Sequence, residues 1–150
     1  MKIPPIPQDF LTRVRTTGLD DQGHPVKRVV AEGGEPCRDV LRRARPGEEL
    51  ILASFSPFHV AGPYKEFGPI FVLANASDES VARDEFPRTD YFREQFVIRA
   101  YSHGEEIVDA AMTQQASAES TIERFFAKDD VAFLHVRFPT YGCFALRLDR

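Results

Sequence analysis

The C-terminal stretch VAFLHVRFPTYGCFALRLDR (residues 131–150) constrains the fold most strongly, because apolar and polar residues alternate in both of its halves. The even-numbered apolar residues are Ala132, Leu134, Val136, Phe138, Phe144, Leu146 and Leu148. A period of two is typical of a strand with one buried face, and the turn residues between the halves are typical of a hairpin. The stretch therefore predicts two antiparallel strands whose even-numbered side is buried.

Burial also predicts the register of this hairpin. A slip of one residue would move the apolar residues of one strand to the opposite face, so even positions should pair with even positions. The expected pairs are Leu134 with Leu146, Val136 with Phe144, His135 with Ala145, and Arg137 with Cys143. This register puts Cys143 beside Arg137, with His135 on the diagonal at roughly 7–8 Å and Arg147 on the same face.

A second hairpin is predicted at QFVIRAYS and EIVDAAMT, residues 95–102 and 106–113. The same reasoning matches three apolar residues of each strand on a buried face: Phe96, Ile98 and Ala100 with Val108, Ala110 and Met112. Arg99 then lies opposite Asp109, in a cross-strand ion pair that contributes well under ~1 kcal/mol where it is exposed.

The remaining elements indicate an α+β fold. Apolar runs at residues 26–32, 49–55 and 70–74 have the length of strands. Helices are expected at three places: DFLTRVR; residues 36–46, where Cys37, Val40, Leu41 and Ala44 recur at helical spacing; and STIERFFAKDD, where Ser120 and Glu123 predict a capping box. Because the helices interrupt the strands irregularly, we expect a mostly antiparallel sheet of about six to seven strands with two or three helices.

One long connection, residues 56–68, contains prolines and glycines that oppose regular pairing. It also carries Phe58, Val60, Tyr64 and Phe67, which represent much apolar area for a solvent-exposed loop. We therefore expect this loop to lie over the sheet.

Length and charge exclude several classes of protein. The 150 residues suit one ordinary domain, with the proline-rich residues 1–8 as an extended arm. With 23 acidic and 19 basic residues, the chain lacks the basic excess of nucleic-acid-binding proteins, so no nucleic-acid partner is expected. No signal peptide and no run of ~20 apolar residues is present, which favours a cytoplasmic protein without a membrane partner.

Several of these stretches together are similar to the bacterial domain-of-unknown-function family 1203. The resemblance covers about residues 37–148 and rests on PCRDVLRRARPGEELILASFSPF, GPYKEFGPIFV, IRAYSHGEEIVDAAM, IERFF and the terminal hairpin. The shared pattern includes Cys37 and Arg38, residues 68–72, the Arg-Ala-Tyr at 99–101, and His135, Gly142 and Cys143. The resemblance implies no activity.

The two cysteines are the candidates for nucleophilic chemistry. Cys37, at the start of the predicted helix, would have its thiolate favoured by the helix dipole, although its place on the apolar stripe also suits a buried structural residue. Cys143 beside Arg137 could be an activated thiol with His135 as its base. No CxxC pair is present, and Cys37, Cys143, His135 and His103 lack the spacing of metal ligands, so neither a metal nor a cofactor is predicted.

A basic set could instead bind an anion. If the two hairpins lie in one sheet, Arg99, Tyr101, His135, Arg137 and Arg147 can point to one side, where arginines would bind carboxylate or phosphate. The alternative is a solvated face whose arginine stems cover apolar surface. We therefore favour binding of a small anionic ligand or an acidic partner, with a thiol enzyme or redox protein and a structural interaction module as the alternatives.

Overall fold

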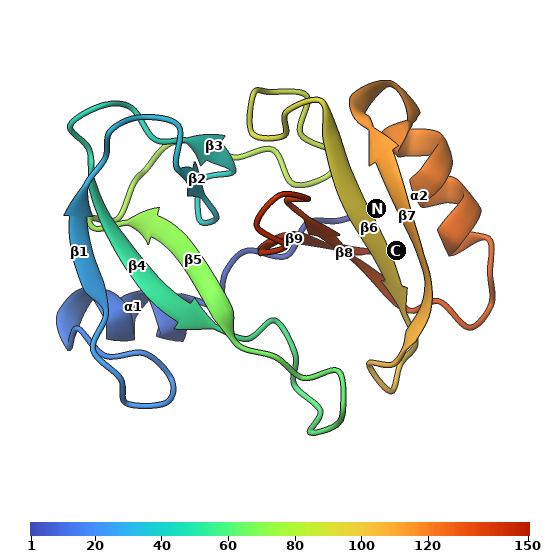
Figure 1. Ribbon diagram of the computed structural model, residues 1–150, viewed down its shortest axis with the longest axis horizontal. Coiled ribbons are helices and arrows are strands. Elements are labelled where there is room, and N and C mark those ends of the chain that lie inside the picture. Colours follow the sequence, from blue (N-terminus) through green and yellow to red (C-terminus); the bar gives the residue numbers. More distant parts are fainter. The chain divides into compact units, whose positions relative to one another are not determined.

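Two sheets organise the chain, and each belongs to its own unit of the computed structural model, which describes residues 1–150 (Figure 1). The five-stranded unit comprises Pro5–Phe55 and Phe67–Val81, and the four-stranded unit comprises Met1–Pro4, Ser56–Glu66 and Ala82–Arg150. The mostly antiparallel α+β class is confirmed, with two helices and nine strands in place of the six to seven expected in one sheet. The single-domain boundary stays a prediction.

The five-stranded unit has the strand order β1-β4-β5-β2-β3. Its strands are β1 (Lys27–Val30), β4 (Glu49–Phe55), β5 (Gly68–Leu73), β2 (Pro36–Cys37) and β3 (Arg42–Arg43). All neighbours are antiparallel except β2 and β5, which are parallel. Helix α1 (Gln8–Thr16) packs on this sheet, with the ring centroids of Phe10 and Phe55 5.0 Å apart. The short N-terminal helix and the strands expected near residues 26–32, 49–55 and 70–74 are thus confirmed.

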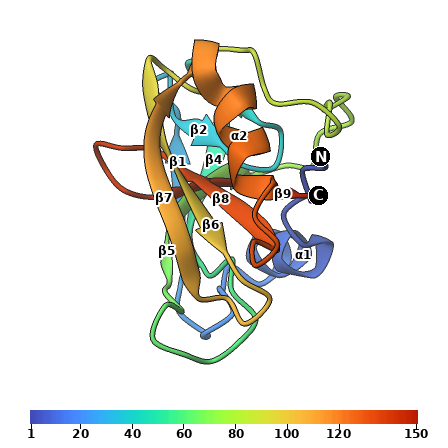
Figure 2. The ribbon, with the colours of Figure 1, turned by 90° about the vertical axis from the view of Figure 1, so that its right-hand side faces the viewer.

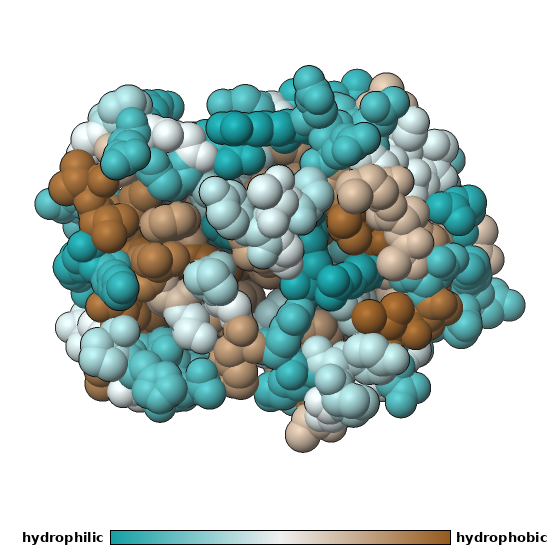
Figure 3. Space-filling model, in the orientation of Figure 1, coloured by the Kyte–Doolittle hydropathy of each residue, from teal (hydrophilic) through white to brown (hydrophobic).

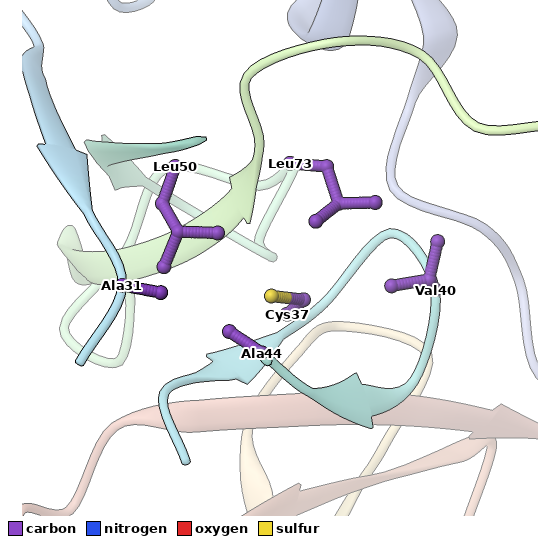
Figure 4. Packing of buried hydrophobic residues seen from close by; sticks show 6 residues of the cluster. All are labelled: Ala31, Cys37, Val40, Ala44, Leu50 and Leu73. Atoms are coloured by element: carbon purple, nitrogen blue, oxygen red, sulfur yellow. The ribbon is translucent and has the colours of Figure 1, made fainter. Parts of the chain in front are cut away.

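The helix predicted at residues 36–46 is wrong. Cys37 pairs in parallel with Phe71 and antiparallel with Arg42, and Leu41 has a φ of 50°, which a right-handed helix cannot contain. The apolar residues of the predicted stripe are nevertheless buried. Figure 4 shows the sulfur of Cys37 among the side chains that form this core cluster: Ala31, Val40, Ala44, Leu50 and Leu73.

The four-stranded unit is antiparallel throughout, with the order β7-β6-β8-β9. Its strands are β7 (Ile107–Gln114), β6 (Gln95–Tyr101), β8 (Phe133–Arg137) and β9 (Phe144–Asp149). Helix α2 (Ala118–Phe126) follows the short 3-10 helix η1 (Gln115–Ser117) and lies beside β7 (Figures 1 and 2). The two ends of the chain are neighbours in this unit, because Lys2 pairs with Asp149.

The capping box expected for this helix is wrong. Helix α2 begins at Ala118, two residues before Ser120, whose hydroxyl donates to the carbonyl of Ser117 at 3.1 Å. Neither α1 nor α2 is long and apolar enough to cross a membrane.

The sheet of the four-stranded unit has two contrasting faces. The helix face carries buried apolar residues, namely Phe96, Ile98, Ala100, Leu134, Val136, Leu146 and Leu148. Residues of β7 join it, because Thr113 pairs with Phe96 and its hydroxyl lies 3.2 Å from the hydroxyl of Thr121 in α2. The opposite side, which we call the arginine face, carries Arg99, Tyr101, His135, Arg137 and Arg147.

The predicted register of β6 and β7 is wrong by one residue. Arg99 pairs with Ala110, and Asp109 lies opposite Ala100 and binds Lys128 at 2.6 Å, so the expected Arg99–Asp109 ion pair does not form. The slip exchanges the faces of β7. Met112, which was expected to be buried, is 58% exposed, and Figure 3 shows brown and pale brown atoms where Figure 1 draws β7.

Candidate functional site

Strand pairing brings the predicted basic set together. Arg99 of β6 pairs with His135 of β8, and His135 pairs with Arg147 of β9. Directly opposed residues point to the same side of a sheet, so these three form one row on the arginine face. Tyr101 and Arg137 lie in the adjacent rows. The prediction of this basic set required that both hairpins lie in one sheet, and they do.

The register of the terminal hairpin differs from the expected one. Even positions do pair with even positions, as in Leu134 with Leu148, but the strands are shifted by two residues. A β-bulge then precedes Arg137, which lies opposite Phe144. The predicted pair Arg137–Cys143 is therefore wrong, because the bulge and the turn were not visible in the alternation of residues.

Arg137 nevertheless has Cys143 nearby. Burial lowers the pKa of the Arg137 guanidinium, and the electrostatic effect of Cys143 acts in the opposite direction. Nη1 of Arg137 donates to the carbonyl of Gly142 at 2.8 Å, and Nη2 forms an ion pair with Glu66. The proximity of Cys143 to a guanidinium survives the change of register.

His135 is the most unusual residue on this face. It is 0% exposed, and its ring is surrounded by four others at centroid distances of 5.0, 4.8, 5.0 and 5.2 Å: Phe58, Tyr101, Phe133 and Phe144. Neither ring nitrogen has a hydrogen-bond partner. A buried polar group without a partner costs about 1–3 kcal/mol, so the fold itself gains nothing from the imidazole.

The surroundings of His135 keep it neutral. Burial, followed by the positive charges of Arg147 and Arg99 and by the neighbouring His59, lowers the pKa of its imidazole to about 3. A neutral imidazole has one nitrogen that donates and one that accepts a hydrogen bond. His135 can therefore offer both functions to a ligand at physiological pH.

The three arginines differ in their partners. Arg137 binds Glu66, while Nε of Arg147 donates to Asp149 at 2.7 Å and its guanidinium carbon lies 3.8 Å from the centre of the Phe133 ring. Arg99 lies close enough to Tyr101 to lower the pKa of its hydroxyl, against the larger effect of burial, and it has no carboxylate partner. Burial raises the pKa of Tyr101, so its hydroxyl stays protonated beside Arg99. Arg99 is thus the arginine whose charge is not balanced by an acid.

The loop of residues 56–68 contacts the arginine face through the ring of Phe58. Two acidic side chains also hold it, Glu66 in the loop and Glu105 in the turn between β6 and β7. Phe58 is buried against Tyr101 and His135, as expected, but Val60, Tyr64 and Phe67 are exposed, which contradicts the expectation for them. Their exposure follows from the way the loop is held, because polar contacts fix its backbone and only one ring enters the core.

Glu105 and Glu66 provide those contacts. The buried carboxylate of Glu105, in the turn between β6 and β7, accepts hydrogen bonds from the backbone N–H groups of His59 and Val60 at 2.8–3.0 Å. Glu105 has a φ of 61°, an uncommon left-handed conformation for a residue other than glycine. Sequence reasoning missed both acids, since nothing in the pattern shows that distant turns meet.

The two cysteines lie in different surroundings. Cys37 is 0% exposed, and burial, followed by the negative charge of Asp39, raises the pKa of its thiol to about 12. The expected helix dipole is absent because Cys37 belongs to a strand. Cys143 is half-buried, and His103 is exposed in the turn after β6. No three acidic, histidine or cysteine side chains are arranged to hold a metal ion.

Comparison with known proteins gives one match. The model of a family described as a protein of unknown function (DUF1203) matches residues 34–150. No curated protein and no solved structure matches the chain. The matched region includes β6, β8 and β9, which carry the arginine face.

Proposed function

The chain belongs to the DUF1203 family, and from its arrangement of side chains we propose that the arginine face binds a small anionic ligand, with Arg99 as the principal contact. The observation that carries the proposal is the row of Arg99, His135 and Arg147, in which Arg99 has no acidic partner. A half-buried guanidinium attracts an anion more strongly than a fully solvated one, because water screens it less.

The two balanced arginines support a carboxylate as the anion. Arg137 and Arg147 each bind a carboxylate of the protein, Glu66 and Asp149. Arginine suits this role because its planar donors match the two oxygens of a carboxylate. The stacking of Arg147 on Phe133 also fits the structural alternative, in which arginine stems cover aromatic surface.

Titration with two simple anions tests the proposal. Succinate and inorganic phosphate, added at constant ionic strength, should shift the amide resonances of β6 and β8 in a saturable way. Arg99→Gln should weaken binding by about tenfold or more, because a hydrogen bond to a charged group contributes about 1.5–3 kcal/mol. Arg88→Gln is the matched control, since Arg88 is an exposed arginine that pairs with Glu119. Unsaturable shifts for both anions, or equal binding by the Arg99 variant, would refute the proposal.

A thiol-dependent activity is the second candidate. It is favoured by the half-buried position of Cys143 next to the Arg137 guanidinium, which would stabilise a thiolate. His135 is a poor general base for it, because the same buried surroundings that keep the imidazole neutral also oppose its taking up a proton. Anion binding is therefore the better-supported function.

A further inference from the structure

On the premise of this anion site, we infer that the ligand is a small hydroxycarboxylate: its carboxylate binds Arg99, and its hydroxyl, a few bonds away, binds the imidazole of His135. The inference rests on a side chain that the fold leaves unused. His135 is completely buried, is enclosed by four aromatic rings, and has no hydrogen-bond partner for either nitrogen. A phenylalanine would fill the same space without an unpaired polar group.

The spacing of Arg99 and His135 suits a small ligand. The two residues are directly opposed across β6 and β8, so their Cβ atoms are about 4.5–5.5 Å apart. A small molecule whose two groups are separated by a few bonds can therefore reach both side chains. Short carboxylic acids with a nearby hydroxyl satisfy this condition.

Charge favours a hydroxyl over an amine as the second group. An ammonium group at His135 would lie between Arg99 and Arg147, which flank the imidazole in the same row and would repel it. A hydroxyl carries no charge and can donate to one ring nitrogen or accept from the other. The row therefore discriminates against amino acids and for hydroxy acids.

The loop of Ser56–Glu66 must open to admit such a ligand. The Phe58 ring contacts the imidazole edge-on at a centroid distance of 5.0 Å and so covers it. The loop is held by Glu105, which binds the backbone at His59 and Val60, and by the Glu66–Arg137 ion pair. Arg137 lies two residues from His135 on the same strand, so a second carboxylate of the ligand could replace Glu66 there.

Malate and succinate provide a matched pair of probes, because they differ by one hydroxyl. We expect the wild-type protein to bind malate at least about tenfold more tightly than succinate, the difference that one good hydrogen bond in a desolvated site produces. His135→Phe should abolish this preference, so that malate binds no more tightly than succinate. His103→Phe, a substitution of an exposed histidine, should keep the preference.

A second measurement does not depend on any variant. In the wild-type protein, malate should shift the ring nitrogen resonances of His135, and succinate should leave them in place. If succinate binds and malate shows neither a higher affinity nor this shift, the inference is overturned while the proposed function stands. If neither acid binds, the proposed function itself fails.

Discussion

The two faces of the four-stranded sheet are built from the same strands and differ in what they bury. The helix face buries Phe96, Ile98, Leu134 and Leu146, and the stacked ring of Phe86 covers part of it. The arginine face also buries most of its residues, but these include an unpartnered imidazole and a guanidinium paired with an acid. The buried hydroxyls of Thr113 and Thr121 on the helix face bind each other, whereas the arginine face keeps the imidazole of His135 without a partner, at a cost to stability.

This difference separates residues that stabilise the fold from residues that the fold tolerates. Removing apolar atoms from the helix face should destabilise the protein, because nothing replaces their contacts. Removing the imidazole of His135 from the arginine face should cost little, since an unpartnered buried polar group opposes folding. Four predictions test this contrast.

Leu146→Ala should have the largest effect. Leu146 is buried on the helix face opposite Val136, and the cavity left by its truncation should lower the free energy of unfolding by about 2–5 kcal/mol. Chemical denaturation measures the change. Met112→Ala, at an exposed position of β7 in the same sheet, should stay within about 0.5 kcal/mol of the wild type. Equal losses in the two variants would show that the helix face is not the stabilising one.

His135→Phe should change how stability depends on pH. The pKa of the imidazole is about 3 in the folded protein and 6.5 when free, so the unfolded state binds the proton more readily. Wild-type stability should therefore be complete above pH 6.5 and decline as the pH falls toward 3, by up to about 1.4 kcal/mol per pH unit from this residue. The stability of the phenylalanine variant should decline less steeply with falling pH, and at pH 7 it should be no lower than that of the wild type.

Denaturation curves at several pH values between 7 and 4 check this expectation. His103→Phe serves as the control, because His103 is exposed in a turn and should leave the slope unchanged. A wild-type slope in the His135 variant would mean that the imidazole is not shielded from protons as its surroundings require.

Comparison with the sequence shows which of these features a pattern can reveal. Alternation correctly identified the buried side of the terminal hairpin at Leu134, Val136, Leu146 and Leu148, since burial depends mainly on side-chain polarity. It was wrong for Phe144, which the β-bulge places opposite Arg137 and against His135 on the arginine face, and Ala132 is only partly buried. Alternation also failed for β7, where Thr113 and not Met112 faces the helix, because the hydroxyl of Thr121 supplies a partner from a distant element. The same limit applies to Cys37, whose burial was expected but whose strand depends on pairing with Phe71.

The sequence predicted which basic residues form the arginine face, but it did not predict the contacts that these residues make. The basic residues of the arginine face follow from placing two hairpins in one sheet. The contacts of Glu66 and Glu105 join segments about 40–70 residues apart in the chain, and the β-bulge before Arg137 depends on local backbone geometry. No periodicity in the sequence encodes such contacts.

Glu105→Gln should have a smaller, local effect on the arginine face. The buried carboxylate holds the loop by accepting from two backbone N–H groups, and the neutral amide should hold it less well. Cleavage by chymotrypsin at the exposed Tyr64 should become up to about tenfold faster, because proteolysis follows the population of the open loop. Glu106→Gln, at the exposed neighbouring position, is the control. Unchanged cleavage in the Glu105 variant would show that Glu105 does not anchor the loop and that Phe58 and the Glu66–Arg137 ion pair hold it.

The last prediction concerns the reactivity of the two cysteines, and it involves no change in stability. Cys37 is 0% exposed with a thiol pKa raised to about 12, whereas Cys143 is half-buried beside a guanidinium. Alkylation of the native protein at pH 8, read by peptide mass spectrometry, should modify Cys143 at least about tenfold faster. Arg137→Gln should slow that reaction by removing the adjacent positive charge, and Arg88→Gln should not. If Cys143 is unreactive and Arg137→Gln changes nothing, the thiol hypothesis is abandoned and anion binding by Arg99 competes only with a structural role for the arginine face.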